Sequence, residues 1–138
     1  MQTDLVTLPK KRPNISVPNV DPSNKNKKIV VVMPAYKAAD TLGWVLSRIP
    51  QGVYDNLFKI LIVEDGGEGI PRSTSPELLE KFPKIEVLYH NKNRGYGGAQ
   101  KSGYKRALEL DADVCVLLHS DGQYAPEIMA ALYRPLVD

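Results

Sequence analysis

Residues 114–127 read Val114-Cys-Val-Leu-Leu-His-Ser-Asp-Gly-Gln-Tyr-Ala-Pro-Glu127, and this stretch indicates the fold class. Its first five residues form a short, unbroken apolar run, which predicts a strand buried on both faces. The apolar character stops at His119, and Pro126 then begins a helical pattern at the first helical position, which proline favours. A buried strand that leads into a helix is typical of α/β proteins, whose ligands bind at the carboxyl ends of such strands.

Three polar side chains follow this strand, namely His119, Asp121 and Gln123. Because side chains alternate along an extended chain, all three can project to the same side. An imidazole nitrogen, a carboxylate and an amide oxygen at this spacing can hold a divalent cation against a phosphate. The alternative is a polar turn of the kind that every α/β protein contains, and so short a motif does not decide between the two.

Apolar runs and helical patterns alternate through the rest of the chain. Strands are predicted at 28–33, 58–63, 85–89 and 114–118, and helices at 42–49, 76–82, 99–110 and from about 126. Pro50 is expected to end the helix at 42–49. Strands and helices at this spacing form right-handed βαβ units, which predicts a doubly wound α/β fold with a mostly parallel sheet. The polar turns after the first, second and fourth strands converge on one ligand if the first strand is central, which gives the strand order 3-2-1-4.

Residues 1–27 differ from the rest of the chain. They contain four prolines, and together with Lys28 they hold six basic and two acidic residues, a balance of +4 in a chain whose net charge is +2. Such a segment cannot bury enough apolar surface to offset the entropy of ordering it. We expect residues 1–27 to be an extended or disordered basic arm and residues 28–138 to form one domain.

The composition excludes several classes of protein. The 138 residues are 43% hydrophobic and 25% charged, which is ordinary for a globular protein. Cys115 is the only cysteine, which excludes an internal disulfide, and its place in an apolar run predicts a buried, inert thiol. No apolar run is long enough to cross a bilayer, so any membrane anchor would have to lie outside this chain. We expect a cytoplasmic protein that binds no nucleic acid.

Two common nucleotide-binding motifs are missing from the sequence. Gly-x-Gly-x-x-Gly does not follow the first predicted strand, and Gly-Lys-Ser/Thr does not occur. The second predicted strand ends instead in Glu64 and Asp65. A carboxylate at this place can accept hydrogen bonds from a nucleobase or a ribose; alternatively, Asp65 stabilises a turn through its own backbone.

A glycine-rich segment, residues 91–98, leads into the third predicted helix. Its glycines allow close approach of the backbone, the helix N-terminus offers N–H groups to an anion, and Arg94 adds a forked donor. The alternative is a loop whose glycines only satisfy unusual dihedral angles. Within the helix, Ala99, Gly103 and Ala107 recur every four residues, which predicts a small-residue face that packs close to the sheet.

Four segments together resemble the motifs of one known family, in that family's order and spacing. They are Val31-Val-Met-Pro-Ala-Tyr36, Ile62-Val-Glu-Asp-Gly66, Asn91-Lys-Asn-Arg-Gly95 followed by Gly98-Ala99, and Ser120-Asp-Gly-Gln-Tyr-Ala-Pro-Glu127. Over about residues 28–134 the chain resembles the family 2 glycosyltransferases, in the branch of the dolichyl- and polyprenyl-phosphate sugar synthases. The resemblance implies a GT-A fold whose Rossmann-like half binds a nucleoside diphosphate sugar across the carboxyl ends of its strands.

The resemblance also implies which residues bind the donor. Asp65 would hold the base, and the other implied donor-binding residues are Pro34, Ala35, Tyr36, Arg94, Gly95 and Gly98. Lys37 and Ala38 replace the Asn-Glu that usually follows the tyrosine in the family.

A divalent cation, Mg²⁺ or Mn²⁺, is implied in the same way. Asp121 and Gln123 match the metal-binding positions of the family's Asp-x-Asp region. His119 stands where the first Asp of that motif usually stands, which leaves one clear carboxylate. If His119 binds the metal, the nitrogen ligand favours Mn²⁺ over Mg²⁺.

The reaction implied is the transfer of a sugar from a nucleoside diphosphate sugar to an acceptor such as a polyprenyl phosphate. The acceptor's base and binding walls follow the Asp-x-Asp region in the family. We therefore expect these 138 residues to be a truncated portion that binds donor without turning over acceptor. We also expect self-association through uncovered apolar surface, and action at the cytoplasmic face of a membrane in a full-length form. Two other interpretations are a non-catalytic nucleotide-sugar-binding module and an unrelated flavodoxin-like regulatory domain.

Overall fold

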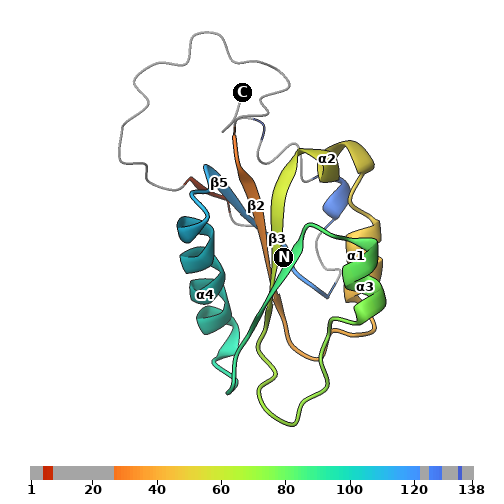
Figure 1. Cartoon of the computed structure of the whole chain (residues 1–138), viewed down its shortest axis with the longest axis vertical. Coiled ribbons are helices and arrows are strands. Elements are labelled where there is room, and N and C mark those ends of the chain that lie inside the picture. The colour runs from red at the N-terminus through yellow and green to blue at the C-terminus, as the bar shows by residue number, and fades with distance from the viewer. Residues whose placement is uncertain (1–4, 8–26, 122–124, 129–133, 135–138) are drawn as a thin grey trace.

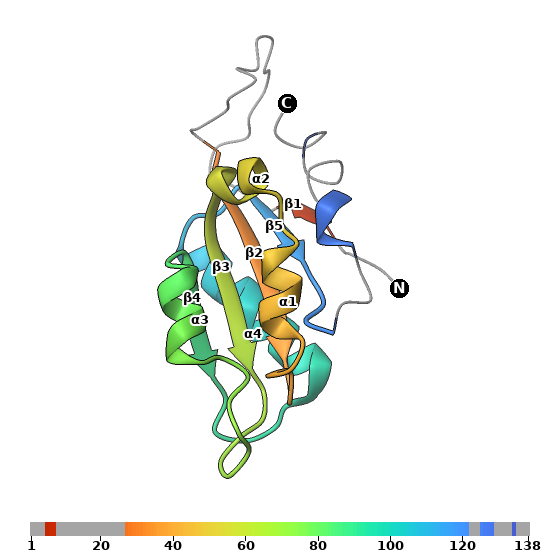
Figure 2. The same ribbon diagram turned by 90° about the vertical axis from the view of Figure 1, so that its right-hand side faces the viewer.

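The computed structural model describes residues 5–7, 27–121, 125–128 and 134. Its centre is a five-stranded sheet in the order β1-β5-β2-β3-β4 (Figures 1 and 2). The strands are β1 (Leu5–Thr7), β2 (Ile29–Ala35), β3 (Leu57–Glu64), β4 (Ile85–Tyr89) and β5 (Val114–Leu117). Strands β5, β2, β3 and β4 run parallel to one another, and β1 pairs antiparallel with β5. The prediction of a mostly parallel sheet is confirmed, and its four predicted strands have the predicted order 3-2-1-4.

Helices cover both faces of the sheet, so the fold is doubly wound as predicted. They are α1 (Leu42–Ser47), α2 (Gln51–Asn56), α3 (Pro76–Lys81), α4 (Gly95–Glu109) and the 3-10 turn η1 (Pro126–Ile128). Helix α4 lies on one face, whereas α1 and α3 lie on the other (Figure 1). Within the described ranges, none of these helices is long and apolar enough to cross a membrane.

Strand β2 supplies side chains to both layers, because successive side chains of a strand point to opposite faces. Val31 and Met33 belong to the apolar cluster that also contains Leu46 of α1. Val30 and Val32 belong to the separate cluster on the α4 side. These four of the seven side chains of β2 are completely buried. A run of β-branched and aliphatic residues suits this strand because neither of its faces meets water.

Helix α4 packs against the sheet through small residues. Ala99, Gly103 and Ala107 are the buried residues of this helix, which confirms the predicted small-residue face. A Cβ atom at Gly103 would lie closer to Cγ1 of Val32 than two carbon atoms can approach. The helix therefore lies at a distance from β2 that only glycine permits at this position.

Two helix boundaries differ from the prediction. The sequence predicts that Pro50 only ends a helix at 42–49, whereas α1 ends at Ser47 and a further helix, α2, begins at Gln51 with Pro50 as its N-cap. A proline φ, here −58°, suits a helix start as well as a helix end. Helix α4 begins at Gly95 rather than at Ala99, so the glycines of residues 95–98 belong to its first turn and not to the preceding loop.

The predicted basic arm is only partly described. Leu5–Thr7 forms β1, with Leu5 opposite Val116 of β5, so this part of the arm is extended and paired within the sheet. The sequence did not indicate this strand, because three residues are too few for a recognisable period. Residues 1–4 and 8–26 lie outside the described residues, as does most of the helix predicted from about 126 beyond η1.

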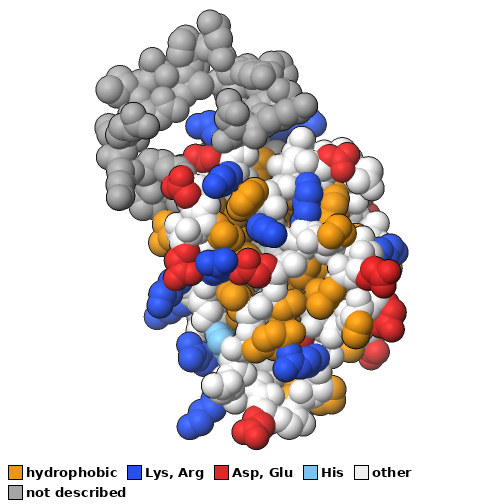
Figure 3. All heavy atoms as spheres, viewed as in Figure 1, with side chains coloured by type: hydrophobic (Ala, Val, Ile, Leu, Met, Phe, Trp, Pro, Cys, Tyr) orange, Lys and Arg blue, Asp and Glu red, His pale blue; other side chains and the backbone are white. Residues whose placement is uncertain are grey.

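Strand β4 is the last strand on one side of the described sheet. Ile85, Val87 and Leu88 are only partly buried, and Tyr89 is exposed. In the view of Figure 1, β4 is the green strand that lies in front. The space-filling view from the same side shows apolar side chains exposed between charged ones (Figure 3). Self-association through uncovered apolar surface stays a prediction.

We expect Gly103→Ala to destabilise the protein by about 1–3 kcal/mol, because the added methyl group overpacks the contact with Val32. Gly97→Ala is the matched control in the same helix. A Cβ atom at Gly97 meets nothing within 4 Å, so this change should be neutral or stabilising by up to about 1 kcal/mol. Urea unfolding of both variants measures the difference. Equal midpoints for the two would contradict the close packing of α4 on β2.

Burial raises the pKa of the Cys115 thiol from 9.0 to about 12. The thiol is therefore neutral and inaccessible in the folded protein, and iodoacetamide at pH 8 should label it only in denaturant. Because the folded pKa is the higher one, the stability from keeping the thiol neutral is complete below about pH 9. This stability is lost as the pH rises from 9 toward 12. Labelling of the native protein at the rate of a free thiol would show that β5 opens easily.

Candidate functional site

A pocket of about 310 Å³ opens at the carboxyl edge of the sheet. The turns after β2, β3, β4 and β5 all contribute to it. Its lining residues are Pro34, Ala35, Tyr36, Asp65, Asn93, Gly95, Tyr96, Ala99, His119, Ser120 and Asp121. The polar turns that the sequence singled out therefore meet at one place, as the strand order requires.

Most of the residues singled out in the sequence line this pocket. Those that do are Pro34, Ala35, Tyr36, Asp65, Gly95, His119 and Asp121. Arg94 and Gly98 lie next to the lining without belonging to it. A Cβ atom at Gly98 would collide with Cβ of Arg94, so glycine is needed there for the first turn of α4 to close on Arg94. Gln123 lies outside the described residues.

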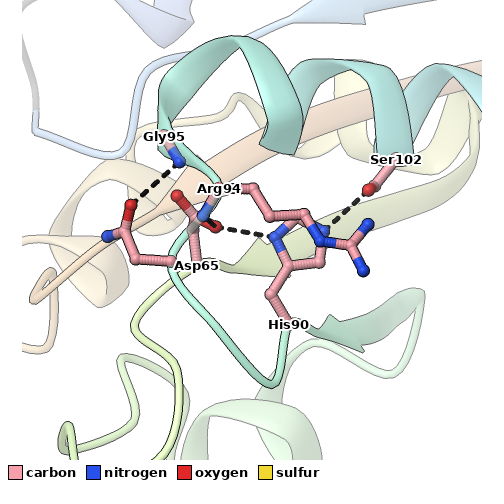
Figure 4. A network of polar contacts seen from close by, with 6 residues as sticks. Asp65, His90, Arg94, Gly95 and Ser102 are labelled. Atoms are coloured by element: carbon pink, nitrogen blue, oxygen red, sulfur yellow. Dashed lines mark hydrogen bonds and ion pairs between the residues drawn. The ribbon is translucent and has the colours of Figure 1, made fainter.

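Asp65 is held by the turn that follows β4, the neighbouring strand. Its Oδ1 accepts hydrogen bonds from Nδ1 of His90 and from the backbone N–H of Arg94, both at 2.7 Å (Figure 4). The other ring nitrogen of His90 lies 2.7 Å from Oγ of Ser102 in α4. Asp65 is only 4% exposed, yet it lines the pocket. One sequence interpretation was that Asp65 stabilises its own turn. Its carboxylate instead accepts hydrogen bonds from the turn after β4.

Glu64, the residue before Asp65, is buried on the other side of the strand end. Its carboxylate accepts hydrogen bonds from the backbone N–H of Ser73 at 2.7 Å and from the backbone and hydroxyl of Thr74 at 3.1 and 2.6 Å. Oγ of Ser73 in turn accepts the backbone N–H of Ala38 at 2.9 Å. These bonds tie the loop after β3 to the turn after β2, and that turn supplies Tyr36 to the pocket.

The turn after β5 is held by two further hydrogen bonds. Oγ of Ser120 donates to the carbonyl oxygen of Pro34 at 2.9 Å, and Oγ1 of Thr41 donates to the carbonyl oxygen of Ser120 at 2.7 Å. The ring of His119 stacks on the ring of Tyr96 from α4, with centroids 5.7 Å apart and planes at 7°. Together these contacts place Asp121 beside the pocket.

The metal-binding side chains that the structure describes at this pocket are too few to hold a divalent cation without a phosphorylated ligand. His119 and Asp121 both line the pocket. Within the described part of the chain, no three His, Cys, Asp or Glu side chains come together as a metal-binding group. A Mg²⁺ or Mn²⁺ ion held by one or two protein groups completes its shell with substrate phosphates and water, as is usual at nucleotide sites. The residues present therefore fit a cation that binds together with a phosphorylated ligand.

The sequence pattern did not indicate that His90 and Ser102 belong to this site. His119 stands out in the sequence because Asp121 lies two residues away, whereas the partner of His90 is 25 residues away. A signal was nevertheless present, since His90 directly follows the predicted third strand and so had to lie at the same edge as Asp65. Tyr96 was also missed, because one aromatic residue among glycines has no pattern of its own.

The fold is that of the GT-A glycosyltransferases. A mannosyltransferase from Pyrobaculum calidifontis, solved in complex with GDP-Man and Mn²⁺, has a similar structure with a TM-score of 0.54 and 19% sequence identity. The likeness covers 80% of this chain and 31% of that one. At this identity it establishes the doubly wound, Rossmann-like fold alone.

The glycosyl transferase family 2 model matches residues 30–138, and the chain belongs to this family. A UDP-N-acetylglucosamine–dolichyl-phosphate N-acetylglucosaminyltransferase of Methanococcus voltae is 31% identical over 125 residues, which is 82% of this chain and 49% of that protein. A dolichol-phosphate mannosyltransferase of Pyrococcus furiosus is 29% identical over 79% of this chain and 30% of its own length. An undecaprenyl-phosphate mannosyltransferase of Micrococcus luteus is 26% identical over 76% of this chain and 42% of its own. The chain thus spans half or less of the length of these relatives.

We expect Glu64→Gln to destabilise the protein by about 1–3 kcal/mol. The glutamine amide would place an NH₂ group against a backbone N–H that now donates a hydrogen bond to the carboxylate of Glu64. Glu68→Gln, an exposed change in the same loop, is the control and should stay within about 0.5 kcal/mol of the wild type. Thermal unfolding of the two variants provides the comparison. If Glu64→Gln melts with the wild type, the loop after β3 is not anchored by this carboxylate.

Proposed function

We propose that this chain is the donor-binding part of an enzyme that transfers a sugar from a nucleoside diphosphate sugar to an acceptor such as a polyprenyl phosphate. One observation carries the proposal: the turns after β2, β3, β4 and β5 converge on one pocket at the carboxyl edge of the sheet, and Asp65 and Asp121 line this pocket. Membership of glycosyl transferase family 2 supports the same reaction class. The relatives named above are transferases whose names include dolichyl, dolichol or undecaprenyl phosphate.

The nucleoside would lie against Tyr36 and Asp65. Both hydrogen bonds that the Asp65 carboxylate accepts within the described residues fall on Oδ1, so Oδ2 has acceptor capacity for the N–H groups of a base. Tyr36 lines the same pocket and is half exposed, and Nζ of Lys37 lies 5.2 Å from the centroid of its ring. The relatives name different sugars, so we propose the donor as a class and not as one compound.

The diphosphate would lie between α4 and the turn after β5. Helix α4 begins at Gly95 in the pocket wall, and the amino end of a 15-residue helix carries partial positive charge. Asp121, with His119 as a further candidate, would hold Mg²⁺ or Mn²⁺. A cation bound there would neutralise charge on the departing diphosphate.

The acceptor step makes modest demands on this part of the chain. An inverting transfer to a hydroxyl group needs a base that takes the proton, whereas a phosphate acceptor is already an anion. We assign no acceptor base among the described residues. A polyprenyl phosphate is a membrane lipid, so transfer to it would take place at a membrane surface.

The direct test is calorimetric titration of the chain with UDP-, GDP- and dTDP-sugars, each with and without Mn²⁺. The proposal expects one nucleotide to bind more tightly than the others and binding to depend on the cation. Equal, weak binding of all three, unchanged by Mn²⁺, would count against a nucleotide-sugar site in this pocket.

We expect Asp121→Ala to abolish the Mn²⁺-dependent part of nucleotide-sugar binding, because a carboxylate brings negative charge to the cation. His119→Ala should weaken binding less, because a neutral imidazole brings only a lone pair. Asp55→Ala, a change of the same charge in α2 before β3 and so at the opposite edge of the sheet, is the control and should leave binding unchanged. Titration of each variant with Mn²⁺ and donor measures the effect. Wild-type affinity in Asp121→Ala would remove this residue as the metal ligand.

A further inference from the structure

Three elements meet at one buried imidazole beside the pocket. His90 follows β4, its Nδ1 lies 2.7 Å from Oδ1 of Asp65 after β3, and its Nε2 lies 2.7 Å from Oγ of Ser102 in α4. Figure 4 shows the ring between these two partners. The side chains of His90 and Asp65 are each only 5% exposed. Water therefore cannot readily replace either bond.

The chemistry of the partners sets the direction of the first bond. An ionised carboxylate only accepts hydrogen bonds, so Nδ1 of His90 donates to Asp65. A hydroxyl group both donates and accepts, so Ser102 can satisfy Nε2 in either role. The ring is thus held at both ends, and α4 is joined through it to the carboxylate in the pocket wall.

These bonds leave Asp65 with one orientation. Oδ1 is occupied by His90 and by the backbone N–H of Arg94, which come from opposite ends of the same short turn. Rotation of the carboxylate would break both bonds, and the side chains of Asp65 and His90 are each only 5% exposed. Oδ2 is thereby kept as the acceptor for a ligand in the pocket.

We propose that His90, braced by Ser102, is a positioning residue that orients Asp65 and so sets the affinity of the pocket for the nucleoside part of its ligand. The inference rests on the proposed function, in which Asp65 contacts the base. His90 itself would touch no ligand. Its effect should therefore be absent for a ligand that has phosphates but no nucleoside.

The test compares four variants by calorimetry with three probes, UDP, GDP and inorganic pyrophosphate, each with Mn²⁺. His90→Phe removes both ring nitrogens at similar size. It should weaken binding of the preferred nucleotide about tenfold, the effect of about 1.4 kcal/mol, and leave pyrophosphate binding unchanged. Ser102→Ala removes only the brace and should lie between His90→Phe and the wild type.

Two further variants form a matched pair that separates positioning from packing. The amide nitrogen of His90→Asn can take the place of Nδ1, so this variant should bind the nucleotide within about threefold of the wild type. In His90→Gln the amide reaches toward the place of Nε2 and cannot serve Asp65 in the same way, so it should bind as weakly as His90→Phe. If His90→Phe fails to fold, the difference in nucleotide affinity between His90→Asn and His90→Gln still tests the positioning role.

Each result bears on the inference. Equal affinity of His90→Asn and His90→Gln, or wild-type affinity in His90→Phe, would overturn the positioning role and leave the proposed function standing. If the His90 variants lose nucleotide binding, pyrophosphate binding and thermal stability together, His90 has a purely structural role and the positioning role is overturned. Failure of the wild-type chain to bind any nucleotide would overturn the proposed function, and this inference with it.

Discussion

The structure depends on the complete burial of β2 between β3 and β5 and between two layers of helices. Val31 and Met33 on one face and Val30 and Val32 on the other have no exposed surface, and burial of each such side chain contributes about 1.5–3 kcal/mol. A strand buried on all sides must be central and must be covered by crossover helices on both faces. This constraint brings the ends of β2, β3 and β5 to one edge, where their turns face one another. The site exists because of that topology.

Two adjacent buried carboxylates turn this edge into a fixed site. Glu64 and Asp65 come at the end of β3 and point to opposite sides, as neighbouring residues of an extended chain do. Neither can be left without partners, because an unpaired buried charge costs several kcal/mol. Glu64 therefore binds the loop after β3, and Asp65 binds the turn after β4. The hydrogen bonds of Asp65 also fix the position of a pocket-lining carboxylate before any ligand arrives, and such preorganisation favours selective binding.

The departure from the family's Asp-x-Asp pattern has a physical counterpart in the pocket. His119 stacks on Tyr96, so the turn after β5 is joined to the start of α4 by an aromatic contact. A carboxylate at residue 119 could not stack in this way. Asp121 lines the pocket, and in the proposed function a cation held there would rely more on its phosphate ligands than at a site with two protein carboxylates.

The sequence by itself determined the α/β class, the four parallel strands, their order and which polar turns meet at the carboxyl edge. These follow from local signals: unbroken apolar runs, helical periods, and polar turns that must converge on one edge. Only the tertiary structure decided that His90 and Ser102 support Asp65, that Gly103 sets the distance from α4 to β2, and that Leu5–Thr7 adds a strand beside β5. Each of these depends on residues distant in sequence, whose pairing leaves no periodic trace along the chain. Contacts of that kind become visible only when the sheet order places their elements side by side.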